Sequence, residues 1–469
     1  MAPEPNGSTP KANFIVVGAG YAGLAASIEL AKRGYAVEVF ESTRDLTNQG
    51  DVIQISSYAT LLMSNWGNVL EESVKISSIV PSLTYFDWKG KPIIEAPLPQ
   101  EFGGFPILYS KRGEIQRLMF EHAKSIGVKF RFGVRVTSYF EEGDKAGIYL
   151  GAERFEACGV IAADGIHSHA RSVVTGKPAT AKTSGFAIYR SWFNLDTLRD
   201  DPLTRAYAES PRDKFHVWLG HNTHCIVMTN TKLRGAVLFC THKASSGGQE
   251  SWTCPGKVSD ILEVMDGWDE VLKAVAKHIP EDNLIDWKLL WRDPAKKWVS
   301  DNGRIQPRAD RSLLVGDAAH PHLPTSGSGA GQAFEDAATI GTLIGKKGIA
   351  NLPVLFRAYE NLRYERTSLT QRLGWETRHR WHQTNWDVVK ANPALVKMPQ
   401  PEWLYGANAI KYTIDNMDAA IDNVEKGSPF ISTNVPEGHE HEDWSVESMM
   451  ELEKQQSQAS FYTASVDVR

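Results

Sequence analysis

The pattern of apolar and polar residues near the start of the chain predicts a strand, a turn, a helix and a second strand. The run at 14–17 is apolar and β-branched, which is typical of a buried strand. Residues 24–32 are mostly small or aliphatic and a glycine follows soon after them, which indicates a helix and its end. Residues 36–40 alternate as a second strand, and Glu41 stands directly after it. The segment therefore predicts a βαβ unit.

The turn of this unit carries glycine at the spacing that a dinucleotide site needs. Gly18 permits the tight turn, Gly20 lets a pyrophosphate approach the backbone, and Gly23 lets the helix lie close to the strand. The start of the helix offers N–H groups and a positive dipole end to the phosphates. Glu41 can accept both hydroxyl protons of a ribose. Because all these parts occur together, dinucleotide binding is favoured over an ordinary βαβ turn.

A second apolar run, at 160–163, predicts a strand that ends in Asp164 and Gly165. Histidine and arginine residues follow within the next six positions. By itself this pattern indicates a strand and a turn, and a simple surface turn explains it as well as a site does.

A third apolar run, at 313–315, predicts a strand followed by Asp317. A loop rich in proline and glycine covers 321–331, and a helix begins at about 332. Asp317 can meet a ribityl or ribose hydroxyl at the strand end. Gly329 and Ala330 can lie against a flat ring, because they carry no bulky side chain.

The pattern changes between 180 and 300, where short strands rich in aromatic residues are separated by glycine turns. This is typical of an antiparallel sheet, and a hairpin at 84–94 has the same character. A sheet inserted between parts of a dinucleotide domain can form the wall of a substrate pocket. The expected strands of the insertion are 186–189, 215–218, 225–228 and 236–240.

The remainder of the chain is expected to be helical from 352 to about 386 and loosely ordered at its end. The helix carries a basic stripe that we interpret as a solvated face: Arg357, Arg363, Arg366 and Arg372. His379 and His382 lie three positions apart, but no carboxylate or cysteine completes a ligand set, so no metal site is expected. Residues 432–469 are polar and acidic, which predicts a disordered tail.

Composition narrows the class of protein. The chain has 469 residues and a formal charge of −5, which argues for two or three domains and against a nucleic-acid surface. Its four cysteines show no Cys-x-x-Cys spacing, which fits a reducing compartment. No apolar run is long enough for a membrane helix, and residues 1–11 lack the apolar core of a signal peptide. We expect a cytoplasmic protein, a monomer or homodimer, without a membrane or nucleic-acid partner.

The three motifs together resemble the single-component FAD-dependent aromatic monooxygenases, the family that includes salicylate hydroxylase, and most of all its fungal secondary-metabolite members. The likeness covers roughly residues 13–375 and rests on the glycine turn, on Asp164-Gly165, and on the Gly-Asp-Ala-Ala-His-Pro segment at 316–321. It implies FAD and NAD(P)H as cofactors, O2 and a small aromatic or alkaloid molecule as substrates, and no separate nicotinamide domain.

The resemblance also implies roles for individual residues. Arg112 and Val52 would contact the flavin, and Asp317 its ribityl chain. Arg190 would hold a phenolate or donate a hydrogen bond to the distal peroxide oxygen, although an internal salt bridge is an alternative. Asp51 replaces a small residue of the family and would be an unusual charge beside the ring. We therefore expect Arg190 and Asp51 to be catalytic.

The fold implied is α/β: a Rossmann-like FAD-binding domain of the glutathione-reductase type, an inserted antiparallel β-sheet substrate domain, and a C-terminal helical region. We expect a flexible N-terminal tail at 1–11 and a disordered C-terminal tail at 432–469. The FAD-binding domain takes 12–75, 107–178 and 290–345, the substrate domain 76–106 and 179–289, and the helical region 346–431.

The activity implied is hydroxylation or epoxidation of an aromatic, indole-type metabolite through a flavin C4a-hydroperoxide, with a rearrangement such as spirocyclisation as a possible outcome. Two alternatives remain open at this point. A flavin oxidase could use the same scaffold, and a halogenase is disfavoured because the chain has no Trp-x-Trp-x-Ile-Pro stretch. A flavin-binding redox sensor without enzymatic activity is the other alternative.

Overall fold

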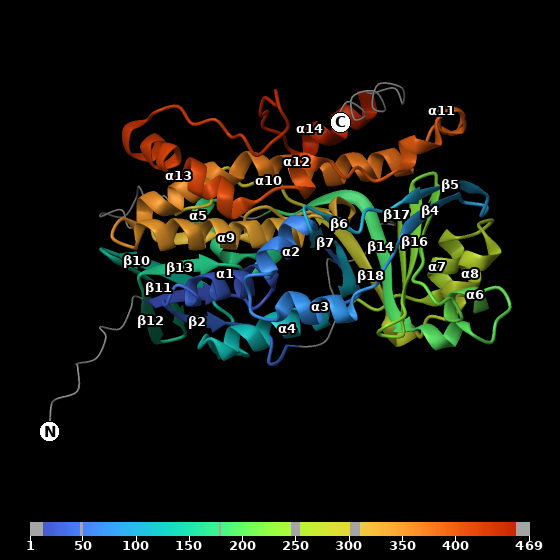
Figure 1. Cartoon of the computed structure of the whole chain (residues 1–469), viewed down its shortest axis with the longest axis horizontal. Coiled ribbons are helices and arrows are strands. Elements are labelled where there is room, and N and C mark those ends of the chain that lie inside the picture. Colours follow the sequence, from blue (N-terminus) through green and yellow to red (C-terminus); the bar gives the residue numbers. More distant parts are fainter. Residues whose placement is uncertain (1–12, 47–49, 178–179, 245–253, 301–309, 456–469) are drawn as a thin grey trace.

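The structure is a computed structural model, and it describes residues 13–46, 50–177, 180–244, 254–300 and 310–455. Figure 1 shows two sheets placed along the long axis of the molecule, with the last helices running along one side of both. The predicted α/β class, with a parallel sheet, an antiparallel insertion and C-terminal helices, is confirmed.

The first sheet has five parallel strands in the order β19-β13-β1-β2-β9. It contains the predicted βαβ unit, in which the apolar run becomes a central buried strand and the glycine turn leads into the first helix. Helices α9 and α4 pack on α1. The bounds are β1 (Asn13–Val17), α1 (Tyr21–Ala31), β2 (Ala36–Phe40), α4 (Arg112–Ser125), β9 (Lys129–Arg131), β13 (Gly159–Ala162), β19 (Ser312–Leu314) and α9 (Gly329–Lys347).

Two glycines of the turn are required by close packing. Gly18 has φ +102°, and a Cβ there would lie 2.4 Å from the carbonyl oxygen of Ala163. A Cβ at Gly23 would lie 1.9 Å from the carbonyl oxygen of Gly18. The turn therefore sits directly against the end of β13, which brings the glycine turn and Asp164 to the same edge of the sheet.

The second sheet has seven strands in the order β18-β14-β17-β16-β15-β4-β5. Its neighbours are antiparallel, as predicted, except for β15 and β4, which are parallel. The hairpin expected at 84–94 supplies the last two strands. The bounds are β4 (Ser82–Asp87), β5 (Pro92–Pro97), β14 (Lys182–Asn194), β15 (Phe215–Gly220), β16 (Thr223–Asn230), β17 (Gly235–Lys243) and β18 (Leu284–Trp291).

The two faces of this sheet have different neighbours. One face packs on α7 (Val258–Val264) and α8 (Glu270–Lys277) and forms an apolar core of its own, which includes Trp218, Val227 and Leu238. The opposite face carries the alternate residues of the same strands. That second face is directed at the rest of the molecule and, as shown below, lines a cavity.

The remaining elements connect and cover these two sheets. They include a meander of β10 to β12 and two short pairs, β3 with β8 and β6 with β7. Their bounds are β3 (Val52–Ile55), α2 (Ser57–Met63), α3 (Val69–Ile76), β6 (Glu101–Phe102), β7 (Phe105–Pro106), β8 (Leu108–Lys111), β10 (Ser138–Glu142), β11 (Lys145–Leu150), β12 (Glu153–Ala157), α5 (His169–Thr175), α6 (Arg205–Ala208), α10 (Leu352–His382), α11 (Trp386–Ala391), α12 (Glu402–Tyr405), α13 (Ala409–Lys426) and α14 (Val446–Gln455).

The long helix α10 corrects one prediction. Two arginines of its basic stripe, Arg363 and Arg366, are only 1% exposed and pair with acidic residues of α9. Arg357 and Arg372 are about one-third exposed. The stripe is therefore a solvated face only in part, because the helix is buried along the side that meets α9.

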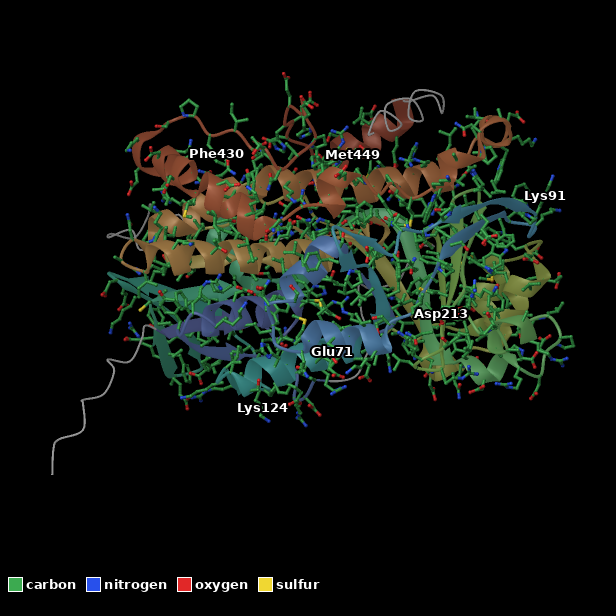
Figure 2. All side chains as sticks on the ribbon, in the orientation of Figure 1. Glu71, Lys91, Lys124, Asp213, Phe430 and Met449 are labelled. Atoms are coloured by element: carbon green, nitrogen blue, oxygen red, sulfur yellow. The ribbon has the colours of Figure 1, made fainter. Side chains whose placement is uncertain are left out.

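The C-terminal segment corrects a second prediction. Residues 446–455 form α14 rather than a disordered tail, and Val446 and Met449 are buried against Trp375 of α10. Figure 2 shows Met449 on α14, beside α10. Glu453 accepts a hydrogen bond from Arg378, which fastens the helix. The last residues of the predicted tail, 456–469, lie outside the described part of the chain, as do residues 1–11 of the predicted N-terminal tail.

Within the described residues, none of the helices has both the length and the apolar composition needed to cross a bilayer.

Candidate active site

A cavity of about 310 Å³ lies between the two sheets. The βαβ turn, β3, the start of α4 and the loop before α9 line it on one side, and the second sheet lines it on the other. A neighbouring hollow extends from it along the first sheet, and Gly20, Ala163 and Gly165 line both. The two spaces therefore lie next to each other, one beside the end of β2 and the other beside the second sheet.

Glu41 lines the neighbouring hollow. One carboxylate oxygen accepts a hydrogen bond from the backbone N–H of Ala19 at 2.7 Å, and the other accepts from the backbone N–H of Thr43 at 2.8 Å. The carboxylate is thus held beside the glycine turn. Gly20, by contrast, has no atom within 4 Å of the position a Cβ would take, so the backbone there faces open space.

Asp164 follows β13 and lines the same outer hollow. Its Oδ2 accepts hydrogen bonds from the backbone N–H groups of His169 (2.9 Å) and Ala170 (3.3 Å). Its Oδ1 is buried and has no hydrogen-bond partner among the described residues. Burial raises the pKa of Asp164, and its hydrogen bonds oppose the shift. An acceptor left unpaired here fits a ligand that brings a donor to the hollow.

Asp317 and Arg112 meet in the main cavity. Asp317 lies in the helical turn Gly316–Ala318 that follows β19. Burial raises the pKa of its carboxyl, with Arg112 acting against the shift. The guanidinium of Arg112 lies 5.4 Å from the ring centre of Tyr21, and the hydroxyl of Tyr21 donates to the backbone oxygen of Arg112 at 2.7 Å. The tyrosine thus ties the start of α4 to the glycine turn.

The loop before α9 forms the floor opposite the glycine turn. Residues 322–330 all line the cavity, and Gly329 and Ala330 are the first residues of α9. No side chain caps this helix start, and none caps the start of α1 at Gly20. Val52, the first residue of β3, lines the cavity from a third side.

Arg190 and Asp51 are joined by a buried, bidentate salt bridge. The side chains are 8% and 5% exposed. Arg190 lines the cavity and lies 4.9 Å from the ring centre of Trp287, whereas Asp51 is not among the lining residues. Asp51 is therefore not an isolated charge beside the cavity: its carboxylate is neutralised by Arg190, the internal pairing that the sequence left open as an alternative.

The wall beyond Arg190 is mostly apolar. It consists of one face of the second sheet together with residues from α10 and the segment after it: Ile188, Phe215, Ile226, Met228, Phe239, Trp287, Trp381 and Met398. Such a wall suits a large, flat, apolar molecule.

Sequence reasoning missed two groups of residues. His224 lines the cavity from β16 and pairs with His382 of α10. The period-two pattern of the strand places it on the same face as Ile226 and Met228, which was a usable signal. Glu335 and Asp336 bind the arginines of α10, and two acidic residues inside an otherwise apolar helix were the corresponding signal.

The residues present fit FAD. The open backbone at Gly20 and the uncapped helix starts suit its phosphates, and the carboxylates at Glu41 and Asp317 suit its sugar and ribityl hydroxyls. The small residues at the start of α9 leave space for a flat ring.

Comparison with known proteins supports the same cofactor. Residues 11–363 match the model of a family described as FAD binding domain. An FAD-dependent monooxygenase of Hypoxylon pulicicidum is 30% identical over 91% of this chain and 95% of its own. The asperlicin C monooxygenase of Petromyces alliaceus is 29% identical, over 90% and 93%.

Among solved structures, CtdE in complex with FAD and a substrate has a TM-score of 0.82 at 28% identity, and covers 89% of this chain and 100% of its own. A salicylate hydroxylase substrate complex shares the fold, with a TM-score of 0.68 at 19% identity. The sequence-based resemblance is therefore confirmed. This chain belongs to the FAD-binding-domain family and is an FAD-dependent monooxygenase of the type found in fungal secondary metabolism.

Proposed function

We propose that this enzyme uses NAD(P)H and O2 to hydroxylate or epoxidise an aromatic, indole-type alkaloid. The observation that carries the proposal is the adjacency of two spaces: dinucleotide-binding features line one of them, and an apolar aromatic wall lines the other. The name of one relative, asperlicin C monooxygenase, supports a complex metabolite as the substrate class. Cytoplasmic location, oligomeric state and the domain boundaries stay predictions.

Each predicted cofactor residue has a role in this proposal. Gly18, Gly20 and Gly23 shape the turn that holds the pyrophosphate. Glu41 binds the adenosine ribose, and Asp317 the ribityl chain. Val52, Gly329 and Ala330 lie against the flat ring, while Arg112 and Asp164 complete the polar lining. When bound, FAD supplies the redox chemistry that activates O2.

Arg190 acts on the substrate side. It lines the cavity as a buried cation, so it can donate a hydrogen bond to an oxygen that gains negative charge during oxygen transfer. Asp51 holds the guanidinium in place and reduces the free energy needed to bury it. Asp51 is therefore proposed as a positioning residue. The apolar wall excludes water, which protects a reactive oxygen species from hydrolytic loss.

The proposal is tested by purification and turnover. The protein is expected to retain flavin, to consume NAD(P)H faster when indole compounds are added, and to incorporate ¹⁸O from ¹⁸O2 into the product. Product that forms with hydrogen peroxide and without ¹⁸O would identify a flavin oxidase instead. Bound flavin with no NAD(P)H consumption would identify a redox sensor.

A substitution at Gly20 separates cofactor binding from folding. Gly20→Ala places a methyl group in open space, so the thermal midpoint of the flavin-free protein is expected to stay unchanged. The methyl group blocks the approach of the pyrophosphate, and FAD affinity is expected to fall by at least about tenfold, or 1.4 kcal/mol. Flavin fluorescence titration measures the affinity. Unchanged FAD affinity would show that the pyrophosphate does not bind at this turn.

A further inference from the structure

The cavity face of the second sheet carries few polar groups. Among its described lining residues, polar groups are carried by Arg190, His224, Thr241 and the indole of Trp287, and Arg190 is paired with Asp51. His224 and Thr241 are directly opposite each other on β16 and β17. His224 therefore presents an imidazole to a mostly apolar wall, beside Thr241 and two residues along the strand from Ile226.

A second histidine holds this imidazole in place. Nδ1 of His224 lies 2.7 Å from Nε2 of His382, at the end of α10, and both residues are at most 2% exposed. The end of α10 is itself fastened to the turn between β15 and β16. The backbone N–H of Asn222 donates to the carbonyl oxygen of His382 at 2.9 Å, and Gln383 donates to the side chain of Asn222 at 2.8 Å.

Both rings are neutral at physiological pH. Burial lowers the pKa of His224 to about 3, and Arg378 adds to the shift. Burial and the neighbouring His224 lower the pKa of His382 well below its usual range. Each ring consequently carries one proton, and in the hydrogen bond between them one ring donates while the other accepts.

Burial decides which ring donates. Nδ1 of His382 is buried and has no hydrogen-bond partner in the described part of the chain. If His224 donated, His382 would carry its proton on that buried nitrogen, where no acceptor could reach it. If His382 donates, the unpaired proton is instead on Nε2 of His224, which lines the cavity, and a group in the cavity can accept it. His382 therefore donates from Nε2. His224 accepts at Nδ1 and must carry its own proton on Nε2.

That proton has no acceptor among the described residues. Nε2 of His224 makes no hydrogen bond among the described residues, and His224 lines the cavity. We propose that the Nε2–H of His224 donates to a carbonyl oxygen of the substrate, so that the enzyme selects aromatic molecules carrying an amide or lactam group. His382 is the positioning residue that fixes the tautomer. This inference rests on the proposed function, because it names a group of the same substrate.

The chemistry of the His224 N–H donor favours a substrate with an amide or lactam carbonyl. A single uncharged N–H suits a neutral acceptor, whereas a carboxylate would need a cation, and the carboxylate of Asp51 already takes Arg190. A substrate without an acceptor would bury the N–H unpaired, which costs affinity. The apolar residues around it, Ile188, Ile226 and Trp381 among them, offer no substitute.

The test uses two indole probes of nearly equal shape. N-acetyltryptamine carries an amide, and 3-pentylindole replaces that amide by hydrocarbon. Their dissociation constants are measured on the FAD-loaded protein, without NAD(P)H, from the change in flavin absorbance. In His224→Leu the preference for the amide probe is expected to fall about fivefold relative to wild type. His224→Gln should keep most of the preference, since its amide can donate, and His382→Leu should lose part of it.

Ile226→Val is the matched control, because it removes only carbon from the same face and should shift both probes alike. Equal weakening of both probes in His224→Leu would overturn the proposal, and so would a flavin-loaded wild type that binds neither probe. If flavin-loaded protein oxidises NAD(P)H with aromatic compounds, but His224→Leu keeps the wild-type preference for the amide probe, the role of His224 is wrong and the proposed function still holds. Protein that never retains flavin defeats the proposed function itself.

Discussion

Two groups of buried charges in this protein border different cavities. Between α9 and α10, Arg363 and Arg366 bind Glu335 and Asp336, and all four side chains are at most 1% exposed. On the cavity wall, Arg190 binds Asp51 beside the aromatic rings of Phe239 and Trp287. Three residues of the first group, Glu335, Arg363 and Arg366, line a separate cavity beside α12 and α13. The second group lies against the space in which a substrate would bind.

The group between α9 and α10 supports the segment around Asp317. Asp336 also accepts hydrogen bonds from the backbone N–H of Gly316 (2.9 Å) and pairs with His320 (2.6 Å), on either side of Asp317. Burial alone raises the pKa of Asp336, but His320 and Arg363 outweigh it and hold the pKa below its usual range. These charges pair with one another and with the segment around Asp317, whereas Arg190 lines the cavity and is proposed to act on the substrate. The difference leads to three predictions.

The largest effect is expected from Arg363→Met. It removes a positive charge that balances the buried carboxylates of Glu335 and Asp336, so the free energy of unfolding should fall by about 3–5 kcal/mol. Urea denaturation measures the loss. Arg372→Met is the control on the same helix: its partner Glu376 is one turn away and the arginine is 37% exposed, so the loss should stay below about 1 kcal/mol. Equal losses in both variants would contradict the comparison.

The second prediction concerns turnover. Arg190→Met should lower kcat on the order of a hundredfold in protein that still binds FAD, because a donor to the developing charge is lost. It should also lower stability, since Asp51 is left buried and unpaired.

The double variant Asp51→Asn with Arg190→Met separates the two effects. It should regain stability, because no charge remains buried, while kcat stays low. Recovery of kcat in the double variant would show that Arg190 serves the fold alone.

The smallest effect is a pH dependence of stability from a third buried pair that is uncharged. His224 has a folded pKa of about 3 and an unfolded pKa near 6.5. The unfolded state therefore binds more protons between these values, and stability is lost as the pH falls through this window. Between pH 7 and 5.5, His224 alone should lower the free energy of unfolding by about 1 kcal/mol. The slope of unfolding free energy against pH should be smaller in His224→Leu than in wild type, and an identical slope would contradict a neutral buried imidazole.

The sequence by itself determined the parts of the site that are local. Gly18, Gly20, Gly23 and Glu41 lie within one βαβ unit, and Asp164 and Asp317 each end a strand of the same sheet. Carboxyl ends of parallel strands meet at one edge, so short motifs sufficed to place these residues together. The alternating strands of the second sheet were likewise readable from the chain.

Only the tertiary structure decided the pairings between distant elements. Asp51 and Arg190 are 139 positions apart, and His224 and His382 are 158 apart. The solvation of the α10 arginines and the order of α14 were also misjudged, because a polar residue has the same appearance in a sequence whether it faces water or a buried partner. Burial and pairing are properties of the packed chain, since they depend on which segments cover which, and no local pattern records them.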